Sequence, residues 1–261
     1  DDAKKLGFEK YEWFPEDCGW LRTKAALEDA EIAKHFLSDD MYRTQYKGGR
    51  PKRAGRIFLR THIREAFVAP DKDRPGYLKD GTPFELDPEK RKSRGEAKGG
   101  IDWGFDHDTV LITGYRELGG KIVLTRMLIG SGTSPSDWAT EVEDLSFQFK
   151  IDDWFADAAG AFQNQEIKDR GLRVVSRAFQ HRSRGKEWMI GIAQKWMQEN
   201  KIVIPDIPEF EPLKAQMRKW RRDMNGKPKK GFDHCNDAFI CFCSGYNPSY
   251  YDGEMETVKQ E

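Results

Sequence analysis

Apolar and polar residues follow two different periods along the chain from residue 99 onward, and the period separates strands from helices. Apolar runs that are continuous or alternate with period two predict strands at residues 99–105, 109–117, 121–130, 152–158, 172–178 and 201–205. Apolar positions three or four residues apart predict helices at residues 134–150, 164–171, 185–200, 208–222 and 233–246. Leu118-Gly119-Gly120 separates the second strand from the third and predicts a tight hairpin.

The order of these elements predicts the fold class. Three successive strands joined by short turns indicate an antiparallel meander. The helices and strands that alternate after residue 130 indicate crossover connections. We therefore expect an α/β fold, in which a mixed central sheet is flanked by helices on both faces.

Residues 1–98 have a different pattern. Helical spacing occurs at about residues 21–37, and RIFLRTHI at residues 56–63 is strand-like. Gly, Pro, Lys and Arg are frequent in residues 47–100, which predicts long loops. The expected division of the chain is a linker or N-terminal extension at residues 1–98, one folded domain at residues 99–250 and a polar tail at residues 251–261.

Composition narrows the possible functions only slightly. The chain has 44 Lys plus Arg and 44 Asp plus Glu, so the net charge says nothing about partners and only the local distribution of charge can. The four cysteines show neither a CxxC pair nor a zinc spacing, and three of them lie in one apolar C-terminal segment. This usage favours a reducing compartment. Because no apolar stretch approaches the length of a membrane span, we expect no membrane partner.

Acidic residues are the strongest chemical signal in the chain. Asp102 lies in the strand at 99–105, Asp157 ends the strand at 152–158, and Asp237 lies in the last helix. The two strands can be neighbours in a mixed sheet, and a helix that crosses their ends can add the third carboxylate. Three clustered carboxylates repel one another unless a divalent cation neutralises them. Oxygen ligands suit Mg²⁺ or Mn²⁺, and two such ions catalyse phosphodiester cleavage.

The acidic residues on the strands also have structural interpretations. Asp102 is compatible with a turn before Gly104, and Asp157 is compatible with the cap of the next helix. Asp108 precedes a strand, where turn closure and an indirect contact with a metal are equally compatible with the pattern. His107 is isolated in the sequence and is expected at the surface.

The last helix offers three candidates for a third metal ligand. Asp233 opens the helix, which favours a helix cap over a ligand. His234 lies three residues before Asp237 on the same helical face, and this makes it a stronger candidate than an isolated histidine. We expect Asp237 to be the primary ligand, because Mg²⁺ prefers oxygen, and His234 to be a further ligand or a phosphate contact.

Basic segments at residues 47–56, 177–186 and 214–230 are candidates for contacts with nucleic acid. The usual meaning of such runs is a solvated surface. However, the third segment directly precedes the helix that carries the third ligand, where a phosphate backbone must approach. Phosphate contacts without base reading suit an enzyme with little sequence preference. The candidate DNA-binding residues are Arg182, Arg184, Lys186, Arg218, Lys219, Arg221, Arg222, Lys227, Lys229 and Lys230.

Three segments together resemble the acidic motifs of a known family. GIDWGFDHDTVLITGY (100–115), WFADAAG (154–160) and FDHCNDAF (232–239) are similar to those of the nuclease domain of the large terminase subunit of tailed bacteriophages. LSDDMYRTQYKGGRPKRAGRIF (37–58) resembles the segment that joins the family's ATPase motor to its nuclease. The resemblance covers about residues 37–245. It implies a ribonuclease H-like fold and an endonuclease that cuts concatemeric double-stranded viral DNA during genome packaging.

The resemblance also implies roles for individual residues. Asp102 and Asp157 become metal ligands, and Asp108 becomes an accessory ligand. Members of the family take the third ligand from the last helix, either as Asp or as His in a DHxxDA motif. DHCNDA in this sequence leaves Asp233, His234 and Asp237 as alternatives. The implied cofactors are two Mg²⁺ or Mn²⁺ ions.

The partners implied by the resemblance are double-stranded DNA, the terminase ATPase domain, the small terminase subunit and the portal. The implied location is the cytoplasm of the infected bacterial host, transiently at the procapsid portal. The family's motor carries a GxxxxGK[ST] phosphate loop, and this sequence has none, so we expect no ATP-driven translocation by this chain alone. The sequence does not begin with Met, and we expect it to be a piece of a longer chain.

Other function classes remain open at this point. A ribonuclease H-like transposase, integrase or junction resolvase predicts strand transfer or a preference for branched DNA. An actin-like ATPase requires a second Gly-rich phosphate hairpin, but the second motif here is Asp157-Ala158-Ala159-Gly160. A non-catalytic DNA-binding module predicts that the acidic residues are caps. Metal-dependent cleavage of plasmid DNA is expected for the terminase-type endonuclease and for the transposase, integrase or resolvase class. It is not expected for the actin-like ATPase or the non-catalytic DNA-binding module.

Overall fold

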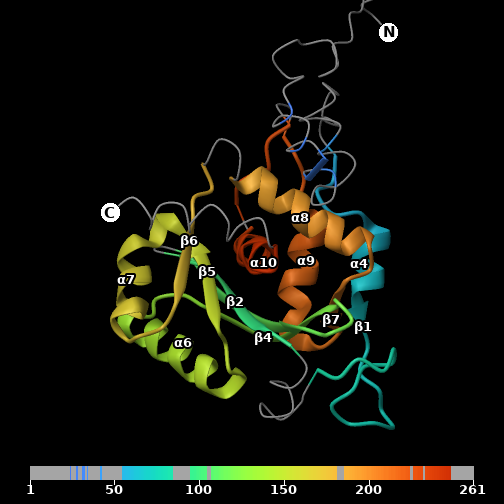
Figure 1. The fold of residues 1–261 in the computed structure, drawn as a ribbon, viewed down its shortest axis with the longest axis horizontal. Coiled ribbons are helices and arrows are strands. Elements are labelled where there is room, and N and C mark those ends of the chain that lie inside the picture. Colours follow the sequence, from blue (N-terminus) through green and yellow to red (C-terminus); the bar gives the residue numbers. More distant parts are fainter. Residues whose placement is uncertain are drawn as a thin grey trace, which may run out of the picture.

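The computed structural model describes residues 24, 28, 31, 32, 34, 42, 55–84, 95–104, 107–180, 185–223, 226–231 and 233–247, and Figure 1 shows their arrangement. Within these residues, seven strands form one mixed sheet in the order β1-β7-β4-β3-β2-β5-β6. The strands are β1 (Phe67–Val68), β2 (Ala97–Asp102), β3 (Thr109–Arg116), β4 (Ile122–Gly130), β5 (Asp153–Asp157), β6 (Val174–Arg177) and β7 (Ile202–Pro205). The helices are α4 (Arg60–Ala66), α6 (Pro135–Phe149), α7 (Ala161–Asp169), α8 (Lys186–Gln198), α9 (Glu211–Lys219) and α10 (His234–Ser244), with short 3-10 helices η3 (Ala158–Gly160) and η4 (Pro208–Phe210).

The pairing of the strands confirms the predicted meander. Antiparallel pairs join β2 to β3 and β3 to β4. β5 pairs with β2 in parallel, with Ile101 opposite Ala156. The ends of these two strands therefore coincide, and each ends in an aspartate. The predicted neighbourhood of the two acidic strands is confirmed.

Helices cover both faces of the sheet, as the sequence predicted (Figure 1). On one face, α4, α8, α9 and α10 pack against alternate strand residues such as Val110 and Ile112. On the other face, α6 and α7 pack against residues of opposite phase, including Ile101 and Leu111. The period-two pattern of β3 therefore separates two apolar layers. None of the helices that the structure describes is long and apolar enough to cross a membrane.

Glycines allow α10 to lie unusually close to the sheet. A Cβ atom added at Gly100 would lie 2.4 Å from the carbonyl oxygen of Ala238 and 2.5 Å from the Cβ of Phe242. A Cβ atom at Gly114 would lie 2.6 Å from the ring of Phe242. A larger residue at Gly100 would move α10 away from β2. The close packing brings the first turn of α10 to the end of β2.

The segment before residue 99 differs from its sequence interpretation. The predicted strand at 56–63 is wrong, because α4 begins at Arg60 and turns Ile63 and Ala66 into the core at helical spacing. The preceding Ile57 and Phe58 lie in a bend and are also buried in the core of residues 99–247. Residues 67–68 add β1 to the edge of the sheet beside β7. The division of the chain at residue 98 stays a prediction, and the predicted tail at 251–261 lies outside the described residues. In the predicted helix at 21–37, the five described residues, Lys24, Glu28, Glu31, Ile32 and Lys34, are helical.

Candidate active site

Five aspartates line one pocket at the C-terminal ends of β2 and β5. Asp102 and Asp157 are the last residues of these parallel strands, and Asp233 and Asp237 lie at the start of α10. The pocket has a volume of about 1410 Å³ and also contains Asp108 and His234. The structure therefore brings together all six predicted metal-binding residues, although they span more than half of the chain.

A hydrogen bond joins the strand to the helix at this site. Nδ1 of His234 lies 2.8 Å from Oδ2 of Asp102, and only 8% of the Asp102 side chain is exposed. The hydrogen bond and the charge of Asp102 raise the pKa of His234 above its ordinary value, although burial opposes this shift. Burial raises the pKa of Asp102, and the nearby charge of Asp157 adds to this effect while His234 opposes it. His234 thus compensates part of the negative charge of the site.

Lys186 supplies the second positive charge. This first residue of α8 places its Nζ 2.6 Å from Oδ2 of Asp237 and 3.1 Å from Oδ2 of Asp233. Burial alone would lower the pKa of Lys186, but the charges and hydrogen bonds of these two aspartates raise it. We predicted Lys186 as a DNA contact. In the structure its ammonium group is held inside the acidic cluster, and a contact with DNA stays a prediction.

The positive charges do not fully compensate the carboxylates. Burial raises the pKa of Asp157 above its ordinary value, and it raises the pKa of Asp237 to about 8 despite the neighbouring Lys186. Oδ1 of Asp237 is buried, and none of the residues that the structure describes forms a hydrogen bond with it. A buried carboxylate oxygen without a partner is costly unless another donor or cation reaches it.

The donor set fits a hard divalent cation. Asp102, Asp157 and Asp237 offer carboxylate oxygens from three elements, which is the ligand type that Mg²⁺ and Mn²⁺ prefer. Among the residues that the structure describes, no three acidic, His or Cys side chains already have the geometry of a metal site. His234 contacts one carboxylate oxygen of Asp102, and Lys186 contacts one of Asp237.

The structural alternatives for the strand residues have different outcomes. Oδ1 of Asp157 accepts a hydrogen bond from the backbone N–H of Ala159 at 3.2 Å, so its predicted capping role is confirmed. The turn interpretation of Asp102 is wrong, because Oγ1 of Thr109 accepts the backbone N–H of Gly104 and closes this turn. Asp157 therefore caps the next turn and lies in the pocket at the same time.

Asp233 and His107 also differ from their sequence interpretations. Asp233 stands at the N-cap of α10, but its side chain makes no capping hydrogen bond. Instead, its carboxylate accepts the backbone N–H of Gly231 at 3.2 Å and the ammonium of Lys186. His107 is exposed as predicted but is not isolated, because its ring centre lies 5.6 Å from that of His234. His107 lines the same pocket.

The predicted DNA-binding residues fall into separate groups. Lys227 and Lys230 are exposed and line the pocket. Arg222 is half-buried, and its Nη1 binds Oε1 of Glu187 at 2.7 Å and the carbonyl oxygen of Gly226 at 2.8 Å. The exposed members that do not line this pocket are Arg218, Lys219, Arg221 and Lys229. Arg182 and Arg184 lie outside the described residues.

Sequence reasoning missed the groups that hold the site in place. Nε1 of Trp103 donates to Oδ1 of Asn164 at 2.7 Å, and Nδ2 of Asn164 donates to the carbonyl oxygen of Asp157 at 3.0 Å. These two hydrogen bonds fix the turn after β5 against the turn after β2. A tryptophan beside a candidate ligand was the one signal in the sequence, and nothing in the spacing connected it with residue 164.

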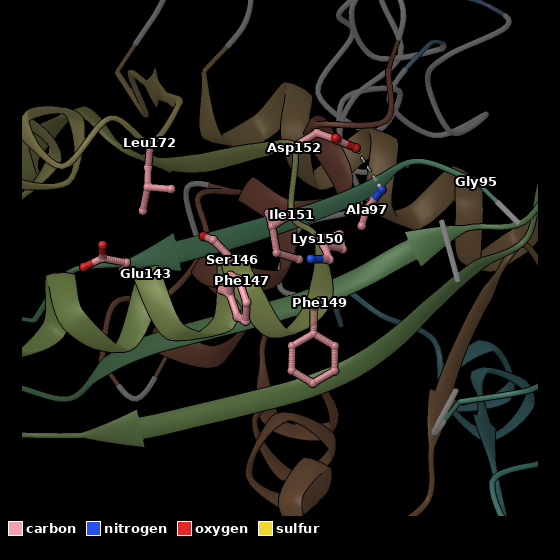
Figure 2. A pocket seen from close by; sticks show the side chains of 10 residues that line it. All are labelled: Gly95, Ala97, Glu143, Ser146, Phe147, Phe149, Lys150, Ile151, Asp152 and Leu172. Carbon is pink, nitrogen blue, oxygen red and sulfur yellow. Dashed lines mark hydrogen bonds between the residues drawn. The ribbon is translucent and has the colours of Figure 1, made fainter. Parts of the chain in front are cut away.

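A second pocket lies at the opposite end of β2 (Figure 2). Its volume is about 450 Å³, and its lining is mainly apolar, with Phe147, Phe149 and Leu172. Oδ2 of its Asp152 accepts the backbone N–H of Ala97 at 3.3 Å (Figure 2). The buried, closely spaced carboxylates are in the first pocket, which is therefore the candidate active site.

Comparisons with known proteins identify relatives of the fold. No protein-family model and no curated protein matches the chain. Among solved structures, a large terminase from a thermophilic bacteriophage is similar to it at 14% identity and a TM-score of 0.62, over 94% of this chain and 58% of that protein. The chain therefore spans less than two thirds of that large terminase.

Two isolated nuclease domains are also similar. The large terminase nuclease of the thermophilic phage G20c has 17% identity and a TM-score of 0.56, over 74% of this chain and all of that domain. The P22 large terminase nuclease domain has 19% identity and a TM-score of 0.52, over 71% of this chain and 89% of that domain. The G20c nuclease was also solved with bound cobalt and with bound magnesium. These similarities confirm the predicted ribonuclease H-like α/β fold.

Proposed function

We propose that this chain is a divalent-metal-dependent endonuclease that cuts concatemeric double-stranded viral DNA during genome packaging. The observation that carries the proposal is the meeting of Asp102, Asp157 and Asp237 in one pocket, where burial raises the pKa of all three carboxyl groups. The fold shared with terminase nuclease domains supports it. A shared fold alone does not establish chemistry, and the side chains of the site therefore carry the argument.

Asp102, Asp157 and Asp237 are the residues that would hold two Mg²⁺ or Mn²⁺ ions, with Asp108, His234 and Asp233 beside them. Bound ions of this kind activate a water molecule and stabilise the leaving oxygen of a phosphodiester. The protein's own contribution is to fix the ligands. His234 orients the carboxylate of Asp102, and Asn164 holds the turn that carries Asp157.

Lys186 keeps Asp233 and Asp237 close together by binding both carboxylates. Repulsion between these two groups would otherwise favour their separation. The first turn of α10 is thereby held in place in the absence of a cation. We assign Lys186 a positioning role on this basis.

The DNA substrate is proposed from charge on the rim of the pocket. Lys227 and Lys230 lie on a hairpin that Arg222 anchors to Glu187 of α8. Lysine ammonium groups suit the phosphate oxygens of the DNA backbone, and contacts with phosphates carry no sequence information directly. We therefore propose cleavage with little sequence preference.

The remaining partners are proposed from the terminase relatives. They are an ATPase domain in the same packaging enzyme, a small terminase subunit and the portal. The proposed location is the cytoplasm of an infected bacterial host, transiently at the procapsid portal. The chain covers 58% of the first of these relatives, and the activities of that whole large terminase are not assigned to it.

The test uses the full 261-residue chain and linear duplex DNA without a fixed sequence. We expect cleavage when Mg²⁺ or Mn²⁺ is present and none when EDTA is present. A junction resolvase would instead prefer four-way junctions to linear duplex, and a transposase would join ends rather than only cut them. Folded protein that cuts neither substrate with either metal would contradict the proposal.

A further inference from the structure

A small three-stranded ladder outside the main sheet carries like charges on one face. Arg56 pairs with Arg221 in an antiparallel bridge, and Arg222 pairs with Pro228 in a second one. The backbone N–H of Lys229 donates to the carbonyl oxygen of Arg221 at 2.9 Å, which places Lys229 opposite Arg221. Because residues opposite each other in an antiparallel pair point to the same side, Arg56, Arg221 and Lys229 share one face.

The pairing of Arg56 with Arg221 is the closer of the two antiparallel geometries. The flanking hydrogen bonds run from Arg222 N–H to the carbonyl oxygen of Gly55 and from Ile57 N–H to that of Trp220. Arg56 and Arg221 therefore form a non-hydrogen-bonded pair, in which the side chains lie nearest each other. Like charges directly opposite in such a pair destabilise the sheet. The ladder thus has a charge arrangement that folding alone does not favour.

On the other face of the ladder, the arginine side chain has hydrogen-bond partners. Trp220 and Ile57 are buried, and Arg222 binds Glu187 and the carbonyl oxygen of Gly226. This face borders the candidate active site, since Pro228 and Lys230 line that pocket. Arg56, Arg221 and Lys229 therefore point away from the inner face that anchors the hairpin.

The outer face carries the three cations and one acidic residue, Asp223, which lies two positions after Arg221 and so shares its side of the strand. Arg221 and Lys229 are exposed, as is Arg60, which follows Arg56 by four residues. Burial, with the charges of Arg60 and Arg221, lowers the pKa of Arg56 from its ordinary value. Nη1 of Arg56 is buried and has no hydrogen-bond partner within the described ranges of the chain. None of these four side chains forms an ion pair with a carboxylate among the residues that the structure describes.

We propose that Arg56, Arg60, Arg221 and Lys229 form a phosphate-binding surface that holds the DNA backbone outside the cleavage pocket. Guanidinium groups bind phosphate oxygens through paired hydrogen bonds, and a phosphate between Arg56 and Arg221 would remove their repulsion. The hairpin would then contact DNA on both faces, with Lys230 toward the pocket and the ladder cations on the other side. This inference rests on the proposed DNA substrate and extends its contacts beyond the pocket.

The test compares three forms of the full-length chain by duplex DNA binding in EDTA. The first is the parent, and the second carries Arg56→Gln, Arg221→Gln and Lys229→Gln. The control carries Lys72→Gln, Lys79→Gln and Lys168→Gln, which remove the same charge from exposed positions elsewhere. Binding is measured from about 50 to about 200 mM salt, and thermal melting verifies that each form is folded.

The slope of log affinity against log salt concentration should become shallower by about 0.9 for each of the three lost contacts in the ladder variant. Between about 50 and about 200 mM salt, the parent's affinity should therefore fall about 40-fold more than that of the ladder variant. The control should keep the parent's slope, and relief of repulsion should leave the ladder variant melting at the parent's temperature or higher. Equal slopes for parent and ladder variant would overturn the phosphate surface, even if the parent cuts DNA. Failure of the parent to cut DNA with metal, with the slope difference present, would instead overturn only the nuclease. Loss of slope in the control as well would overturn the assignment to these residues.

Discussion

Nδ1 of His234 lies 2.8 Å from Oδ2 of Asp102, although 132 residues separate them in the chain. This contact ties the first turn of α10 to the end of β2. It places Asp237, one turn further along the helix, next to the same pocket. The geometry of the candidate site therefore depends on the docking of one helix against one strand.

The third metal ligand can be identified by three alanine variants of α10. We expect Asp237→Ala to abolish cleavage with Mg²⁺ and Mn²⁺, because its unpartnered buried oxygen is the best placed for a cation. His234→Ala should reduce cleavage and leave measurable activity with Mg²⁺, since it removes an orienting hydrogen bond, a loss that costs roughly 10- to 100-fold. Asp233→Ala should have an intermediate effect by releasing Lys186. Full activity in Asp237→Ala together with an inactive His234→Ala would make His234 the ligand.

Metal binding should appear directly in thermal stability. At a metal concentration tenfold above the dissociation constant, Mn²⁺ should stabilise the parent by about 1.4 kcal/mol. For a domain of this size that corresponds to a rise of roughly 3–6 °C in melting temperature. Asp102→Asn should lose most of this rise, because it removes a charged ligand. Equal Mn²⁺-induced shifts in the two proteins would mean that the ions bind elsewhere.

The metal-free protein should become less stable as the pH rises. Burial raises the pKa of Asp237 to about 8 in the folded protein, whereas the unfolded chain has the ordinary value near 4. Between these values the folded state holds a proton that the unfolded state has lost, so the free energy of unfolding falls from about pH 4 to about pH 8.

Asp237→Asn should flatten this dependence when unfolding is measured in EDTA. Each unit of the pKa shift corresponds to about 1.4 kcal/mol, so the difference between parent and variant should widen measurably toward pH 8. Asp152→Asn, at the other end of β5, serves as the matched control. Parallel pH profiles for the parent and Asp237→Asn would show that Lys186 fully compensates the carboxylate.

Docking of α10 on β2 can be tested at a glycine. Gly100→Ala should destabilise the protein by about 1–3 kcal/mol or more, because the added Cβ meets backbone that cannot move independently. Gly119→Ala is the matched control, since a Cβ there meets nothing within 4 Å, and its effect should stay within about 0.5 kcal/mol. Denaturant unfolding measures both. Comparable stabilities for the two variants would argue against the close helix–strand contact.

The period of apolar residues was sufficient to predict most of the architecture. β3 alternates between two apolar layers, and the Leu118-Gly119-Gly120 turn leads directly into β4, so local sequence determines the meander. Segment 56–63 has a strand-like pattern because Ile57, Phe58 and Leu59 form an apolar run that continues into the short helix α4. Only packing against α8 and α9 shows that Ile63 faces the core.

The acidic residues of the candidate site could be predicted from the sequence, but the lysine that compensates their charge could not. Each aspartate ends a strand that the local sequence pattern predicts. Asp102 and Asp157 could be placed side by side because the order of elements makes β2 and β5 candidates for neighbouring strands. The contacts of Lys186 with Asp233 and Asp237 span 47 and 51 residues and depend on how α8 packs beside α10. No local pattern distinguishes such a lysine from a solvated one, and the sequence therefore predicts only that Lys186 is a DNA contact.

The central claim is that the carboxylates at the ends of β2 and β5 bind the metal that cuts DNA. The most direct measurement is cleavage of supercoiled plasmid in Mg²⁺ and in Mn²⁺ by the parent, Asp102→Asn, Asp157→Asn and the control Asp152→Asn. Asp152 flanks the other end of β5, and asparagine there keeps an acceptor for the N–H of Ala97. The account predicts that the parent and Asp152→Asn cut with metal and that the other two variants lose more than the roughly 100-fold that loss of an orienting partner costs. Cleavage at the parent's rate by both Asp102→Asn and Asp157→Asn would contradict it.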